Sequence, residues 1–169
     1  MEEIAQARSL LAKQRYMEAA DMLDRLLPRN PDNDELWYLR GIVSLKLKSY
    51  DAAQECFERA LLLGRKSKYY QIKGMAHFEV FEMDEAVWAF MNALTLEPDD
   101  PTTNFFLAIC YLFLDDPRSD EHIRRAYALN SKKTRQLLLN FYTFFLKDDP
   151  RVGDAQRRAI EAQIRGLKG

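Results

Sequence analysis

Small side chains return along this chain about every 33 residues, and this recurrence limits the possible folds more than any other feature. Aligned on the last of them in each unit, the positions are Leu26 (in place of a small residue), Ala60, Ala93, Ala126 and Ala159, at intervals of 34, 33, 33 and 33. A fixed period of this length is typical of stacked supersecondary units, each too small to bury its own apolar surface. We therefore expect an array of similar units instead of one globular topology.

Within a unit, large and very small side chains alternate at helical spacing. The clearest example has Trp37, Gly41, Tyr50, Ala53, Phe57 and Ala60. Two antiparallel helices need this pattern where their backbones cross closely and aromatic rings fill the remaining gaps. Each unit is therefore predicted to be a helical hairpin, with close approach of its helices at Gly41 in the second unit and Gly74 in the third.

These residue types at these places resemble the tetratricopeptide repeat, a motif of about 34 residues with Trp, Gly or Ala, Tyr, Ala, Phe or Tyr, Ala and Pro at set positions. The units are 1–33, 34–66, 67–100, 101–133 and a diverged 134–167, and the second and third match best. The resemblance implies an all-α, right-handed α-solenoid of about five antiparallel helix hairpins. Residues 1–169 would form a single array, with the last one or two units diverged or capping. Arg65 stands where the pattern has proline.

Charge and composition argue against nucleic-acid binding and membrane insertion. The formal charge is −1, divided into about −6 over residues 1–130 and +5 over residues 131–169. A protein that binds nucleic acid needs a clearer surplus of basic residues, so nucleic acid is not expected as a partner. The start of the chain lacks the features of a signal peptide, and the apolar runs are about half the length of a spanning helix, so we expect no membrane insertion. With two cysteines outside any disulfide or metal pattern, a cytoplasmic location is predicted.

The residues offer little for catalysis. His77 and His122 each stand alone on an expected helix, and a general base needs a positioned partner. The acidic pairs at 99–100, 115–116 and 148–149 precede helix starts, where carboxylates cap free amide groups. No glycine-rich phosphate loop or Cys/His cluster occurs in the sequence. We therefore predict no enzyme, no metal and no cofactor.

The resemblance also implies a binding surface, because the first helices of such repeats line the concave side of the array. The family's groove positions fall on Tyr38, Ile42, Leu45, Lys68, Gln71, Met75, Phe78, Phe105, Ile109 and Leu112, with Glu35 and Thr102 beside them. This apolar and aromatic lining suits an amphipathic helix or an extended apolar segment. The same stripe would equally serve as core between helices, and both interpretations stay open at this point.

One familiar subclass does not fit. Family members that hold the terminal carboxylates of heat-shock chaperones use Lys, Asn, Asn, Lys and Arg on three successive first helices. The corresponding positions here are Ile4, Arg8, Leu39, Lys68 and Ile72, of which Lys68 alone matches. Without converging cations and amides the carboxylates would be poorly paired, so this clamp is not expected.

Two functions from different classes remain. The first is a non-enzymatic interaction scaffold or chaperone-like adaptor that binds an apolar or amphipathic segment of another protein in its groove, similar in size and lining to chaperones of type III secretion. The second is a structural subunit of a larger assembly or a homodimer, docking through the apolar residues 137–146 and the basic residues that follow. Binding of peptides and the oligomeric state separate the two.

Overall fold

The computed structural model describes residues 2–148, 150, 153–155, 157–158 and 161–162 of the 169-residue chain. Every regular element in these ranges is a helix, and none is a strand. The chain forms two compact units, unit 1 from Met1 to Leu96 and unit 2 from Glu97 to Gly169. The single array over residues 1–169 stays a prediction, and each unit is described by itself.

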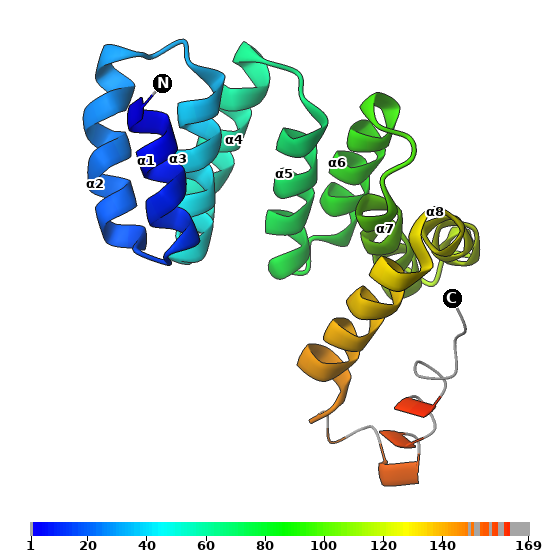
Figure 1. The fold of residues 1–169 in the computed structure, drawn as a ribbon. Helices are drawn as coiled ribbons and strands as arrows, with labels where there is room; N and C mark the ends of the chain where they lie inside the picture. The colour runs from blue at the N-terminus through cyan, green and yellow to red at the C-terminus, as the bar shows by residue number, and fades with distance from the viewer. Residues whose placement is uncertain (1, 149, 151–152, 156, 159–160, 163–169) are drawn as a thin grey trace. The chain divides into compact units, whose positions relative to one another are not determined.

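Unit 1 is a row of helical hairpins. In chain order its elements are α1 (Glu2–Ala12), α2 (Tyr16–Leu26), the 3-10 turn η1 (Leu27–Arg29), α3 (Asp34–Lys46), α4 (Tyr50–Leu63), α5 (Ser67–Glu79) and α6 (Met83–Leu96). Consecutive helices pair as antiparallel hairpins, α1 with α2, α3 with α4 and α5 with α6 (Figure 1). The hairpins stack in chain order, because α2 packs on α3 and α4 packs on α5.

The close approach predicted inside these hairpins is confirmed at both glycines. A Cβ atom added at Gly41 would lie 2.3 Å from Cε1 of Phe57, and one added at Gly74 would lie 2.7 Å from Cδ1 of Phe90. Both rings are buried, and Phe57 packs in a cluster with Leu45, Ala53 and Ala76. Glycine is therefore required on the first helix because the ring from the second helix occupies the space of a side chain.

The turn within each hairpin ends in the left-handed backbone region without a glycine. The angle φ is 58° at Gln14, 62° at Lys48, 62° at Phe81 and, in unit 2, 53° at Asp115. In every case the next backbone N–H donates to the carbonyl five residues before it, at 2.8 to 3.0 Å. This 6→1 bond closes a helix end even where the left-handed residue carries a side chain. The same strained turn thus recurs with the period of the repeat.

Unit 2 contains α7 (Pro101–Phe113), α8 (Arg118–Phe141) and the π-helical turn η2 (Tyr142–Leu146). α7 pairs with the first half of α8 as a fourth hairpin, and Figure 1 shows α8 as two segments that meet at an angle. Within the described residues of both units, no helix is both long enough and apolar enough to cross a membrane.

Acidic residues cap the helices of unit 2, as the sequence predicts. The Asp100 carboxylate accepts from the backbone N–H three residues on at 2.6 Å, and Pro101 takes the first turn of α7. The Asp116 carboxylate accepts from the backbone N–H two residues on at 2.9 Å. Pro117 precedes α8 instead of opening it. Of the third predicted pair, Asp149 lies outside the described residues.

The fourth and fifth predicted units are joined without a loop, which the sequence pattern did not indicate. Through residues 118–141, all of which are described, only Asn130 leaves helical geometry, with φ −159° and ψ 89°. Its side chain accepts from the N–H of Lys133 at 2.9 Å and so caps the second half of α8. Thr134 Oγ1 donates to the carbonyls of Ala126 and Asn130 at 2.8 and 2.9 Å. Much of the second half of the predicted unit 134–167 falls outside the described residues.

Candidate protein-binding site

A hollow of about 490 Å³ opens on the face of unit 1 to which α1, α3 and α5 contribute. It is lined by Arg8, Leu11, Ala12, Tyr16, Glu35, Tyr38, Leu39, Ile42, Lys46 and Lys68. Its floor is apolar and its rim carries three cations and one carboxylate. A larger hollow of about 650 Å³ beside α1 and α2 is lined mostly by charged side chains of both signs and contains none of the predicted groove residues.

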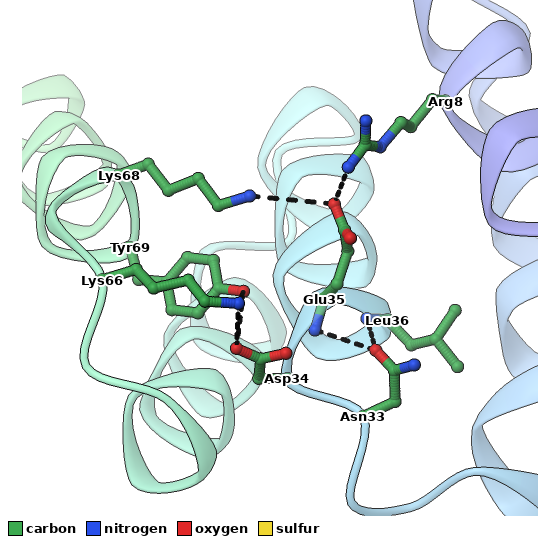
Figure 2. A network of polar contacts seen from close by, with 8 residues as sticks. All are labelled: Arg8, Asn33, Asp34, Glu35, Leu36, Lys66, Lys68 and Tyr69. Carbon is green, nitrogen blue, oxygen red and sulfur yellow. Dashed lines mark hydrogen bonds and ion pairs between the residues drawn. The ribbon is translucent and has the colours of Figure 1, made fainter. Parts of the chain in front are cut away.

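Glu35 lies on the rim, between two cations from neighbouring hairpins. Figure 2 shows Arg8 of α1 and Lys68 of α5 reaching toward it from opposite sides. Arg8 forms an ion pair with Glu35, and Lys68 Nζ lies 3.7 Å from the same carboxylate oxygen. Asn33 fixes this turn of α3, because its side chain accepts from the backbone N–H of Glu35 at 3.0 Å. One carboxylate therefore holds two cations on one side of the hollow.

Aromatic rings support Lys68 from below. The rings of Tyr38 and Tyr69 lie 4.8 Å apart, and Lys68 Nζ lies 4.9 Å from the first centroid and 5.3 Å from the second. Burial, with a contribution from the Glu35 charge, raises the pKa of the Tyr38 hydroxyl. A cation above two neutral rings is attracted by their quadrupoles, which restrains a long and otherwise mobile side chain.

A second polar network fixes the start of α5 and therefore the position of Lys68. Lys66 Nζ lies 2.5 Å from Asp34 Oδ2, and the Tyr69 hydroxyl donates to the same oxygen at 2.9 Å (Figure 2). Burial tends to raise the pKa of Asp34, but the bonds from Lys66 and Tyr69 outweigh it and hold that pKa below its usual value. Burial raises the pKa of Tyr69 to about 12. A Cβ at Gly64 would lie 2.3 Å from the same Asp34 oxygen, so this link leaves space for the carboxylate.

The structure brings together only part of the predicted groove. Tyr38, Ile42 and Lys68 line the hollow. Gln71 and Met75 are partly exposed outside it, whereas Leu45 and Phe78 are buried in unit 1. In unit 2, Phe105 and Ile109 are buried, and Leu112 is exposed beside a smaller hollow of about 270 Å³. The complete groove stays a prediction.

Several lining residues were not predicted as groove residues, and the sequence holds a signal for two of them. The interval from the first unit to the second is 34 residues, so Ile42 and Leu45 correspond to Arg8 and Leu11. Carrying the groove positions back by this interval would have found both. Lys46 follows a predicted position by one residue, and no feature of the sequence marks it.

The hollow contains no arrangement for acid–base or nucleophilic chemistry. Both histidines lie elsewhere: His77 Nδ1 is 2.6 Å from Glu82 Oε2, and His122 Nδ1 is 3.0 Å from Asn104 Oδ1. Among the residues that the structure describes, no group of three or more His, Cys, Asp or Glu side chains could hold a metal ion. What the hollow offers is an apolar floor beneath an excess of two positive charges.

Helical hairpins that stack in register, with an open face on their first helices, define an α-solenoid of the protein-interaction class. Two sequence models described as tetratricopeptide repeat match residues 4–70 and 67–100. The chain therefore belongs to the tetratricopeptide repeat family, as its repeat pattern predicted, and the predicted α-solenoid of helix hairpins is confirmed.

Individual relatives are distant. The "TPR repeat-containing protein MJ1428" of Methanocaldococcus jannaschii is 22% identical over 110 residues, which cover 65% of this chain and 19% of that protein. The chain thus spans about a fifth of the length of this relative. Among solved structures, MamA aligns with a TM-score of 0.71, 16% identity and coverage of 94% and 90% of the two chains. The first TPR of Spaghetti (RPAP3) bound to the HSP90 peptide SRMEEVD aligns at 0.64, 23% identity and 68% and 91% coverage. These likenesses support the fold.

Proposed function

We propose that this protein is a non-enzymatic adaptor that binds an amphipathic segment of another protein in the hollow of unit 1. Apolar side chains of the segment would cover Leu39 and Ile42 on the floor. Acidic side chains would meet the cations on the rim. The observation that carries this proposal is the combination of an apolar floor with three cations and one carboxylate in the lining, where Arg8 and Lys68 share Glu35 and Lys46 lies further along α3.

The chemistry of the rim favours an acidic segment over a basic or neutral one. Arg8 and Lys68 already share Glu35, and Lys46 lies on the rim with an exposed side chain. One carboxylate of an acidic segment would pair with Lys46, and another would compete with Glu35 for Arg8 and Lys68, because residues 35 and 46 lie about three turns apart on α3. A similar solved structure holds a peptide with two adjacent glutamates, so a fold of this kind accommodates such a ligand. The two asparagines of the heat-shock clamp are replaced here, and that clamp is not part of the proposal.

Three synthetic helical peptides of equal apolar face test the proposal, with polar faces of Glu, Gln or Lys. Fluorescence anisotropy should show that the Glu peptide binds the full chain at least tenfold more tightly than the others, because a charge-assisted bond contributes about 1.5–3 kcal/mol. Lys68→Glu and Ile42→Glu should weaken binding, and Glu35→Gln should strengthen it by freeing Arg8 and Lys68. Lys13→Glu, at an exposed site outside the hollow, is the matched charge control.

Equal binding of the three peptides, or no binding of any, would contradict the proposed function. Unchanged affinity in Lys68→Glu and Ile42→Glu would move the site away from the hollow. Each variant is compared with the unaltered chain by far-ultraviolet circular dichroism, so that a loss of binding is read only from folded protein.

A further inference from the structure

Unit 2 exposes a group of large apolar side chains that the proposed function does not use. They come from the end of α7 and from η2, and we call them the aromatic surface: Leu112, Phe113, Leu114, Phe144 and Phe145. Phe144 is 80% exposed, Phe113 49% and Phe145 42%. Such side chains are normal on a surface when scattered, but a contiguous group marks a contact site.

Ring contacts connect Phe113 at the end of α7 with Phe145 in η2. Phe141 of α8 lies between them, with centroid distances of 6.3 Å to Phe113 and 5.0 Å to Phe145. A phenylalanine side chain can bury about 200 Å². The exposed parts of Phe113, Phe144 and Phe145 therefore amount to about 340 Å², before the leucines are added. This approaches half of the ~800 Å² per partner that a stable interface buries.

Charges of opposite sign lie at the two ends of this surface. Lys132 and Lys133 are exposed at the start of the second half of α8, and residues 131–147 contain no acidic residue. At the other end, the turn after α7 places Asp115 and Asp120 around the hollow lined by Leu112. This turn lies near the end of α8, because Phe113 contacts Phe141. The same end also carries Arg118, which pairs with Asp116, and the exposed Lys147 and Asp148, so its net charge is negative but small. The aromatic surface is therefore basic at one end and net acidic at the other.

We infer that the aromatic surface is the contact between two copies of this chain, with the helical segments 131–146 packed antiparallel about a two-fold axis. The segment is about 24 Å long at 1.5 Å per residue, so an antiparallel partner brings each basic end opposite an acidic end. A two-fold contact uses the same patch on both copies, and the aromatic surface supplies both signs of charge that such a contact needs. An anionic membrane would be repelled by the acidic turn, and a purely basic or purely acidic partner would leave one end unmatched.

Sedimentation equilibrium of the full chain tests this inference. The unaltered chain should be a dimer at micromolar concentration, and Phe144→Glu should raise the dimer dissociation constant at least tenfold. The matched control is Leu62→Glu on α4 of unit 1, since Leu62 is 79% exposed and lies outside the aromatic surface. This control should remain dimeric.

Charge exchange then tests the antiparallel arrangement in folded protein with the apolar residues intact. Lys132→Glu with Lys133→Glu should weaken the dimer, and Asp115→Lys with Asp120→Lys should weaken it too. All four substitutions together should restore it, because the ends again carry opposite signs. A monomeric unaltered chain, a Phe144→Glu variant that still dimerises, or a fourfold variant without recovery would each overturn the inference. Peptide binding in unit 1 is measured separately, so either proposal can fail alone.

Discussion

Replacing Gly41 with alanine tests the packing argument on which the hairpins depend. Two effects of opposite sign meet at this position. Alanine is favoured over glycine inside a helix by about 1 kcal/mol. Against this, the new Cβ would lie 2.3 Å from Cε1 and 2.5 Å from Cδ1 of Phe57, well inside van der Waals contact. Phe57 is fully buried and cannot swing into solvent, so the ring or the helix must shift.

Overpacking of a well-filled core costs about 1–3 kcal/mol, and the short contact with a buried ring places Gly41→Ala toward the upper end. After the gain in helix propensity, the free energy of unfolding should fall by about 1–2 kcal/mol. Urea unfolding followed by tryptophan fluorescence measures this change. Both tryptophans of the chain, Trp37 and Trp88, lie in unit 1, so the signal reports on the unit that contains the substitution.

A second substitution separates the two effects. Phe57→Leu removes the ring from the space above Gly41, so in this background Gly41→Ala should be neutral or stabilising. The coupling energy of the double-mutant cycle should then be at least about 1 kcal/mol. If Gly41→Ala stabilises the unaltered chain as much as it stabilises the Phe57→Leu variant, the ring is not what requires glycine here, and the packing argument is wrong.

Two further predictions follow from other sites. Gln14→Gly should raise the free energy of unfolding by about 1 kcal/mol in the same fluorescence assay, because the left-handed backbone at this exposed residue costs a side chain about 1–2 kcal/mol, whereas Gln14→Val should lower it. Burial lowers the pKa of His122. The positive charges of Arg125 and Arg118 also lower this pKa, and the negative charge of Glu121 opposes them. The unfolded chain therefore binds the extra proton between that lowered pKa and about 6.5, so the contribution of His122 to stability is lost as pH falls through this window. The free energy of unfolding, measured by urea unfolding and circular dichroism, should fall less between pH 7.5 and 5.5 in His122→Gln than in the unaltered chain. An equal fall in both proteins would refute this assignment.

The hairpins could be predicted because their signal lies in residue size. A glycine on the first helix and a phenylalanine sixteen residues later occur as Gly41 with Phe57 and again as Gly74 with Phe90, and both pairs make the expected contact. The turns gave no such signal. Glycine is the residue expected where the backbone enters the left-handed region. Here Lys48 and Phe81 occupy that region, and the 6→1 backbone bond holds them there.

The join inside α8 could not be predicted from spacing. The period continues through residues 126–134 without an insertion, and a repeat boundary without proline or glycine looks like any other boundary. The change of direction depends on one residue, Asn130, whose side chain caps the following helix while its own backbone is extended. Asparagine is common in loops and helix caps alike, so its presence does not distinguish a loop from a bend.

The candidate site shows why an apolar stripe alone could not be assigned to groove or core. Ile42 and Leu45 stand three residues apart on α3, yet the first lines the hollow and the second is buried in the core. Periodicity gives both the same weight, because a face that packs and a face that binds have the same spacing. Charge separates them, since an ion pair is rarely placed in a core. The charged residues Arg8, Glu35 and Lys68 interrupt the stripe where hairpins meet, and these interruptions mark the part of the face where the structure has its hollow.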